Sequence, residues 1–189
     1  GAVNNTTFNN VRVNNSGGQG IFFSNVAHNL TITGSRVIKS GARGIYFDGT
    51  GSSFTNVDII NTKIDSSGTA GVEAYFYGTG TNADMDFTGD TITYSGEDGI
   101  LVRWPNDNSD VTVTGCVLAH NGRTSTAGDG IQVQNLGKVI VTQNSIFDNA
   151  GQGINLNGSG NCSLDPQDPI INSIINNGGG SYTVNFTIP

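Results

Sequence analysis

The residues of this chain that could do acid–base chemistry are spaced at a repeat interval. Asp98 and Asp129 each precede a Gly-Ile pair, and Tyr94, His120 and Asp148 occupy the same place in three successive copies of a repeat. If the copies stack, neighbouring members of each set lie about 4.8 Å apart, the spacing of adjacent strands. Two carboxylates that close could share a proton and cleave a glycosidic bond. The alternatives are structural, with the Asp pair at a turn and the Tyr, His and Asp set at a bend.

A second group of residues is suited to binding a sugar chain. Its members lie on or just after the segments that follow Gly-Ile or Gly-Val pairs: Tyr46, Asp48, Glu73, Tyr75, Arg103 and Trp104. Aromatic faces can stack against sugar rings, and carboxylates and guanidinium groups can form hydrogen bonds with hydroxyls. These residues predict a glycan-binding patch. The alternative is an ordinary solvated sheet face.

Four carboxylates predict a third candidate site. Asp84 and Asp86 flank Met85, and Asp58 and Asp110 lie one repeat before and one repeat after. Stacked like charges repel, and hard oxygen ligands favour Ca²⁺. Calcium therefore fits this cluster. The alternative is an acidic patch in contact with water, which costs little free energy, and we expect no required cofactor.

Composition narrows the classes of partner. The chain has 189 residues, 28 of them Gly, 12% charged residues and a net charge of −7. A negative net charge disfavours nucleic acids and anionic membranes, and no apolar run approaches the ~18 residues of a membrane span. Cys116 and Cys162 have neither zinc-site nor redox spacing. Whether they form a disulfide is left open.

Gly followed by Ile or Val recurs at Gly20, Gly44, Gly71, Gly99, Gly130 and Gly153. A second marker has apolar residues at relative positions 0, 2 and 7, with a small polar residue at position 5. Its clearest copies begin at Leu30, Val57, Met85, Val111 and Val139, which are 27, 28, 26 and 28 residues apart. Alternation within each run predicts strands. A repeat of this length predicts a solenoid whose strands pair in parallel with their equivalents one coil later.

Stacking of the coils would place like residues in columns. One inward column contains Ile21, Ile45, Val72, Ile100, Ile131 and Ile154, and the next contains Phe23, Phe47, Ala74, Val102, Val133 and Leu156. Burying each large member contributes roughly 1.5–3 kcal/mol. The position-5 residues predict a hydrogen-bonded corner ladder of Thr6, Ser35, Thr62, Asp90, Cys116 and Asn144.

The recurring Asn-Val-x-Ile-x-x-Ser-x-Ile followed by Gly-Ile-x-Val resembles the β-helix repeat of the pectate-lyase-like superfamily and of large bacterial surface proteins. The resemblance implies an all-β, right-handed, single-stranded parallel β-helix of about six coils. We expect this helix over residues 1–157. Residues 158–189 are expected to form a capping or linker segment leading into a further β module, because 181–188 alternate like a strand.

Proteins that share this scaffold include polysaccharide lyases, hydrolases, epimerases and non-catalytic adhesins. Because the paired Asp-Asp and Gly-His-Gly motifs of the polygalacturonase-type hydrolases are absent, the leading hypothesis is an extracellular or cell-surface scaffold. Such a segment of a larger protein would bind a polysaccharide or another surface glycan, or would associate end to end. The alternative is a polysaccharide-active enzyme that uses acid and base residues on adjacent coils.

Overall fold

The computed structural model describes residues 3–24, 27–50, 54–77, 83–103, 109–134, 138–157, 170–178 and 181–187. These residues form strands joined by turns and bends, with no helix among them. Eighteen of the strands belong to three six-stranded parallel sheets, which we call A, B and C. The predicted all-β solenoid is confirmed.

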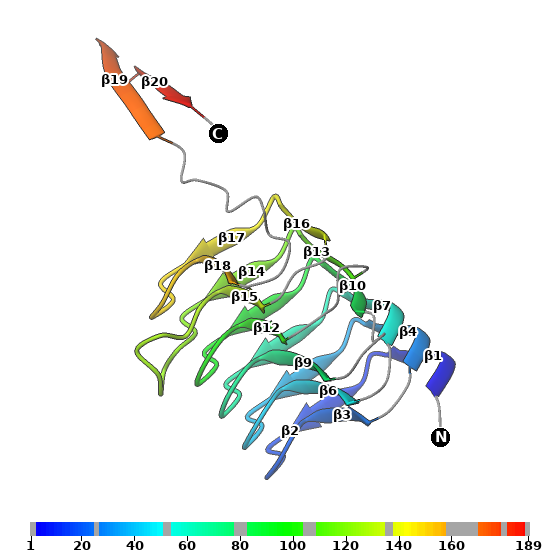
Figure 1. The fold of residues 1–189 in the computed structure, drawn as a ribbon. Coiled ribbons are helices and arrows are strands. Elements are labelled where there is room, and N and C mark those ends of the chain that lie inside the picture. The colour runs from blue at the N-terminus through cyan, green and yellow to red at the C-terminus, as the bar shows by residue number, and fades with distance from the viewer. Residues whose placement is uncertain are drawn as a thin grey trace.

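Each coil contributes one strand to each sheet, so six coils succeed one another along the molecule (Figure 1). Sheet A consists of β1 (Val3–Asn9), β4 (Ala27–Thr33), β7 (Phe54–Ile60), β10 (Ala83–Thr88), β13 (Asp110–Thr114) and β16 (Lys138–Thr142). Sheet B consists of β2 (Arg12–Asn14), β5 (Arg36–Ile38), β8 (Lys63–Asp65), β11 (Thr91–Thr93), β14 (Val117–Ala119) and β17 (Ser145–Phe147). Sheet C consists of β3 (Ile21–Ser24), β6 (Ile45–Thr50), β9 (Val72–Tyr77), β12 (Ile100–Arg103), β15 (Ile131–Gln134) and β18 (Ile154–Asn157).

The register of sheet C matches the repeat. Ile45 pairs with Ile21 on one side and with Val72 on the other, and the pairing continues through Ile100 and Ile131 to Ile154. The second inward column is paired in the same way from Phe23 to Leu156. The register of both predicted columns is confirmed, so equivalent residues lie one above another, but Ile154 in the last coil is 44% exposed.

The core lies between the three sheets and consists of these columns. Ile32, Ile59, Phe87 and Val113 form the equivalent buried column of sheet A. Aromatic rings continue the packing across the core, because Phe47 stacks on Phe23 at 5.1 Å and meets Phe54 edge to face at 5.3 Å. The apolar columns hold the coils together by removing these side chains from water.

The corner between sheets A and B carries the predicted polar ladder. In each coil the position-5 backbone N–H donates to the position-5 side chain of the next coil. Thr62 N donates to Asp90 Oδ1 at 2.7 Å and Cys116 N donates to Asn144 Oδ1 at 2.8 Å. The Cys116 thiol is free and buried within this ladder, and burial raises its pKa to about 11. Cys162 lies outside the described residues.

One member of the ladder was predicted incorrectly. Thr6 pairs with Leu30, not with Ser35, and the position-5 residue of the first coil is Val11, whose N–H donates to Ser35 Oγ at 3.1 Å. The physical reason is that Phe8 occupies the inward column above Ile32, where its ring meets Phe23 at 5.5 Å. With this contact the position-5 residue of the first coil lies five residues after the expected Thr6.

Beyond the coils, β19 (Ile170–Gly178) and β20 (Ser181–Thr187) pair as an antiparallel hairpin. The expected strand near residues 181–188 is thus confirmed. Within the described part of the chain, no helix is long and apolar enough to cross a membrane.

Candidate functional site

The outer face of sheet C brings together most of the predicted glycan-binding residues. Tyr46 pairs with Glu73, and Asp48 pairs with Tyr75, which in turn pairs with Arg103. Because side chains alternate along a strand, these five side chains share the face opposite the apolar columns. Trp104 lies outside the described residues.

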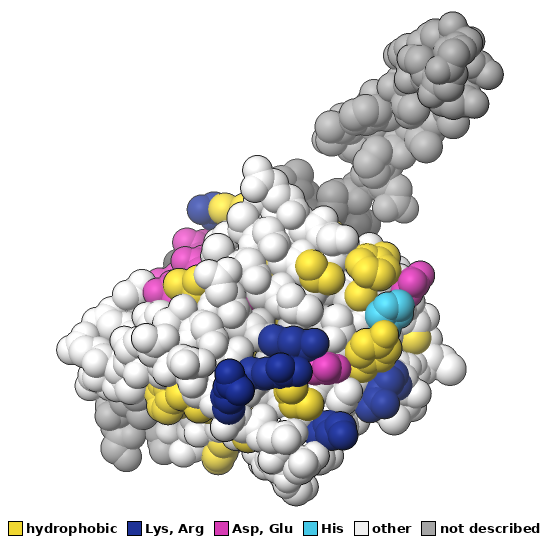
Figure 2. All heavy atoms as spheres, turned by 180° about the vertical axis from the view of Figure 1, so that it is seen from behind, with side chains coloured by type: hydrophobic (Ala, Val, Ile, Leu, Met, Phe, Trp, Pro, Cys, Tyr) yellow, Lys and Arg dark blue, Asp and Glu magenta, His cyan; other side chains and the backbone are white. Residues whose placement is uncertain are grey.

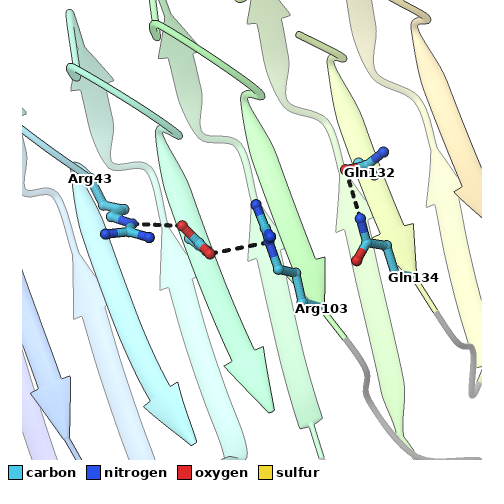
Figure 3. A network of polar contacts seen from close by, with 5 residues as sticks. Arg43, Arg103, Gln132 and Gln134 are labelled. Atoms are coloured by element: carbon cyan, nitrogen blue, oxygen red, sulfur yellow. Dashed lines mark hydrogen bonds and ion pairs between the residues drawn. The ribbon is translucent and has the colours of Figure 1, made fainter. Parts of the chain in front are cut away.

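Glu73 is the centre of a charged network on this face (Figure 3). Arg43 Nε donates to Glu73 Oε2 at 2.6 Å. On the opposite side, Arg103 Nε lies 3.2 Å from Glu73 Oε1, in ion-pair contact but without the alignment of a hydrogen bond. The Glu73 side chain is only 2% exposed, whereas the two Arg side chains are about one-third exposed. A buried carboxylate is therefore held between two cations that reach solvent.

Aromatic rings extend the network toward the first coil. Phe22 and Tyr46 stack with ring centroids 5.4 Å apart and an interplanar angle of 9°. The Arg43 guanidinium lies 4.7 Å from the Tyr46 ring centroid, within the range of a cation–π contact. Phe22 is 51% exposed, so the Phe22–Tyr46 pair offers apolar surface next to the charges.

The surroundings of Arg43 and Tyr46 stabilise the protonated form of each side chain. The hydrogen bond to Glu73 raises the pKa of Arg43 further above its usual value. Burial, with Asp48 and Glu73 nearby, raises the pKa of the Tyr46 phenol. At neutral pH the face therefore presents a neutral phenol at Tyr46 and a cation at Arg43, which can bind a ligand without exchanging protons with it.

Amides and a buried apolar residue continue the face toward the last coils. Gln134 Nε2 donates to Gln132 Oε1 at 3.1 Å. Leu101, which pairs with Glu73 and Gln132, is completely buried although it points away from the core. Two central residues of this face, Glu73 and Leu101, are therefore shielded from solvent.

Asp98 and Asp129 lie in adjacent coils, as predicted, but their carboxyl groups bind the backbone of the next coil. Asp98 Oδ1 accepts from Asp129 N at 2.7 Å, and Asp129 Oδ1 accepts from Gln152 N at 2.6 Å. Asp129 Oδ2 accepts from Asn155 Nδ2 at 2.7 Å. Burial raises the pKa of Asp98 to about 6, against the opposing effect of the Asp129 N–H. This geometry favours the turn role over an acid–base pair.

Tyr94, His120 and Asp148 also lie in successive coils, each directly after a strand of sheet B. All three have positive φ, between 53° and 57°. The Tyr94 and His120 rings stack at 4.9 Å, and His120 Nδ1 lies 3.9 Å from Asp148 Oδ2. The rings are thus close, but Asp148 is 71% exposed and forms only a long contact with the imidazole.

The four predicted metal ligands meet in two pairs on the outer face of sheet A. Asp86 pairs with Asp58, and Asp84 pairs with Asp110. Burial, followed by repulsion from Asp86 and Asp84, raises the pKa of Asp58. Among the described residues, no three acidic, His or Cys side chains converge closely enough to hold a metal ion. Calcium binding by these residues stays a prediction.

Arg43 is the site residue that the sequence analysis missed. It lies 30 residues before its partner Glu73 and just before the Gly44-Ile45 pair. Asp98 and Asp129 occupy the equivalent place in later coils, so the position directly before a Gly-Ile pair could have marked Arg43 as a candidate. Arg43 differs because its long side chain reaches over the outer face of sheet C, whereas the short Asp side chains stay at the corner.

The geometry defines a parallel β-helix repeat protein with a polar and aromatic outer face on one sheet. The family described as "Right handed beta helix region" matches residues 2–168. The chain belongs to this right-handed β-helix family, and the predicted family and handedness are confirmed. No curated protein and no solved structure matches the chain.

Proposed function

We propose that this β-helix is a stiff, non-catalytic extracellular scaffold that binds a glycan chain along the outer face of sheet C. The observation that carries the proposal is the Arg43–Glu73–Arg103 network next to the stacked rings of Phe22 and Tyr46. Ring faces suit sugar rings, and guanidinium and amide groups donate to their hydroxyls. The face combines both kinds of contact across several adjacent strands.

The preorganisation of the charged network supports a binding role. Glu73 fixes both guanidinium groups before any ligand arrives, so little side-chain entropy is lost on binding. The Arg heads keep N–H groups that are not used by Glu73, because each Arg has five donors. Such fixed donors recognise a neutral or mixed glycan through short-range hydrogen bonds, which depend only weakly on salt.

The predicted carboxylates supply little support for catalysis. Asp98 and Asp129 hold successive coils together through hydrogen bonds to the backbone. One observation favours a second candidate, a lyase or epimerase, because Tyr94 and His120 are stacked on adjacent coils and partly exposed. That candidate requires a sugar chain to lie over sheet B rather than over sheet C.

The scaffold role follows from the stacking of the coils. Apolar columns and a polar corner ladder resist bending between coils, and the sparse charges leave most of the surface uncharged. No cofactor is needed for this role. End-to-end association of coils, through strand edges at the ends of the stack, would extend the scaffold into a filament.

A glycan panel tests the proposal. The chain is titrated with soluble neutral and uronate-containing oligosaccharides by calorimetry, in parallel with assays for new reducing ends and unsaturated products. We expect binding without product, and a loss of about three- to tenfold in affinity for the neutral oligosaccharides on Tyr46→Ala substitution, the size of a lost stacking contact. Tyr94→Ala, which removes a Tyr beside sheet B, is the matched control and should bind the neutral oligosaccharides as the unchanged chain does.

Two outcomes would contradict the proposal. One is turnover of any glycan that His120→Ala abolishes, which would favour the lyase or epimerase. The other is equal binding by Tyr46→Ala and the unchanged chain across the whole panel, which would show that the outer face of sheet C is not the binding site.

A further inference from the structure

The outer face of sheet B has a charge opposite to that of the whole chain. Arg12 pairs with Arg36, and Arg36 pairs with Lys63, so three cations stand on three adjacent strands. We call these three residues, together with Lys39 just after β5, the basic stripe. The stripe lies on a different sheet from the network of Figure 3 and shares no residue with it.

The basic stripe has little compensation from acids. Lys63 Nζ lies 3.5 Å from Asp65 Oδ2, but within the described part of the chain neither Arg12 nor Arg36 forms an ion pair. Arg12 and Arg36 are exposed. Like charges on directly opposed residues repel, so the stripe is a set of stacked cations whose mutual repulsion an anionic ligand would relieve.

Aromatic rings continue the same face beyond the basic stripe. Tyr94 and His120 stack at 4.9 Å, and Phe147 meets His120 edge to face at 5.6 Å; we call these three residues the ring stack. Arg123 adds a cation here, because its Nε donates to the Tyr94 carbonyl oxygen at 2.7 Å. Figure 2 shows this face, with a cluster of basic side chains, an acidic side chain at the edge of the cluster, and a His flanked by hydrophobic side chains.

The face holds five of the eight Lys and Arg residues, namely Arg12, Arg36, Lys39, Lys63 and Arg123. Among the acidic residues that the structure describes, the face holds two, Asp65 and Asp148. Its local charge is therefore +5 − 2 = +3, in a chain of net charge −7. The local excess of positive charge would direct a polyanion to this face.

Exposed ring surface distinguishes between classes of polyanion. His120 stacks on one side of the Tyr94 ring. On the other side the equivalent residue of the preceding coil is the small Ser66, so no second ring of this column covers the Tyr94 ring there. The uncovered side of the Tyr94 ring borders the coil that contains Lys63. A sugar ring placed there would contact the phenol ring while an acidic group on the same chain reached the stripe.

We propose that the basic stripe and the ring stack bind a linear acidic polysaccharide, which runs across the strands of sheet B. Neighbouring cations are separated by one strand spacing, about 4.8 Å, which is of the order of the length of one sugar ring. An extended chain with an acidic group on successive sugars can therefore place a charge near each rung. The proposal does not depend on glycan binding at sheet C.

Binding of defined polymers to the full chain tests this proposal. The probes are polygalacturonate fragments for carboxylated glycans, heparin fragments for sulfated ones, dextran as the neutral polymer, and single-stranded poly-dT as the nucleic acid. We expect at least one acidic glycan to bind more tightly than dextran and poly-dT, with affinity that falls as salt rises. Whichever acidic glycan binds more tightly identifies the acidic group.

Two variants and two controls locate the site. Arg12→Gln with Arg36→Gln should weaken acidic-glycan binding about three- to tenfold, as expected for two exposed charge contacts, and Tyr94→Ala should weaken it further. Lys138→Gln removes an exposed cation of sheet A, and Tyr46→Ala removes the sheet C ring; both should leave this binding unchanged. Because Arg12 and Arg36 are exposed, thermal unfolding should confirm that the double variant folds.

Three results with the acidic glycans would overturn the proposal. These are the absence of binding to both acidic glycans, equal affinity of the double variant and the unchanged chain, and a loss for Lys138→Gln as large as that for the double variant. Tighter binding of poly-dT than of either glycan would also overturn it, by assigning the face to nucleic acid. If the sheet B proposal fails, binding of neutral oligosaccharides by Tyr46→Ala still tests the sheet C proposal separately.

Discussion

The corners and the outer faces of this β-helix use the same residue types for different purposes. At the corners, Asp90, Asp98 and Asp129 accept hydrogen bonds from backbone N–H groups of adjacent coils. On the outer face of sheet C, Glu73 instead binds two Arg side chains and no backbone group of the described residues. A carboxylate at a corner therefore holds coils together, whereas one on a face organises a surface.

The comparison shows where function can reside in a solenoid. A corner residue cannot change its partners without breaking the contact between coils, so it is poorly suited to binding or releasing a ligand. A face residue is free of that constraint, because the backbone of its strand is already paired on both sides. The candidate sites are accordingly the outer faces of sheets C and B.

The largest effect is expected at the corner, for Asp90→Asn. Asp90 is completely buried, and burial raises its pKa to about 8, against hydrogen bonds that lower it. Between pH 3.8 and 8 only the unfolded chain ionises this group, so the free energy of unfolding should fall as pH rises through that window, by up to about 1.4 kcal/mol per pH unit. Asn cannot ionise, so Asp90→Asn should remove this pH-dependent fall in the free energy of unfolding. We expect the variant to be more stable than the unchanged chain by about 2–4 kcal/mol at pH 7.

The same ladder shows that Asn fits the corner. Asn144 occupies the equivalent place two coils later, where its Nδ2 donates to the Val113 carbonyl oxygen at 2.8 Å. Denaturant titrations of Asp90→Asn from pH 4 to 9 should give a flatter stability profile than the unchanged chain. Asp148→Asn, at an exposed position, is the control. A profile for Asp90→Asn as steep as that of the unchanged chain would show that Asp90 is not the titrating group.

The next largest effect is expected on the face of sheet C, for Glu73→Gln. Removing the charge leaves Arg43 and Arg103 without a counter-charge. Breaking a fully buried pair costs roughly 3–5 kcal/mol, but these Arg heads are partly solvated, so we expect about 2–3 kcal/mol. The loss in the free energy of unfolding is measured by urea titration, with Glu97→Gln as the control. A loss as small as that of the control would mean that the network contributes little to the face.

A smaller loss is expected for Asp129→Ala at the corner. Both carboxyl oxygens bind the last coil, through Gln152 N and Asn155 Nδ2, so their loss should cost about 1–2 kcal/mol. Glycan affinity should not change, which separates corner from face. If Asp129→Ala folded normally and lost glycan binding or an activity, the corner would have a functional role.

The smallest effect is expected from calcium. The carboxylates of Asp58, Asp84, Asp86 and Asp110 meet in pairs, so Ca²⁺ should stabilise the chain by about 0.5 kcal/mol or less through weak occupancy. Thermal unfolding with Ca²⁺ and with a chelator measures the effect. A rise of several degrees that Asp58→Asn with Asp86→Asn abolishes would instead indicate a specific calcium site.

The repeat made the columns predictable, because inward residues such as Ile45 and Val72 must meet their equivalents to leave water. The first coil was misaligned, since Thr6 replaces the apolar marker and the contact of Phe8 with Phe23 decides the register. The sequence also could not reveal that Arg43 reaches Glu73, because that contact depends on the path of a long side chain over the sheet. Nor could it reveal that backbone N–H groups engage Asp98 and Asp129.

An NMR titration of the full chain with the tightest neutral or mixed glycan of the panel tests the central claim most directly. We expect the largest amide shifts at Phe22, Tyr46, Glu73 and Arg103, with the corner amides of Asp90, Asp98 and Asp129 nearly unchanged. Shifts centred on Asp98 and Asp129, or the appearance of cleaved or epimerised glycan during the titration, would contradict a non-catalytic site on the face of sheet C.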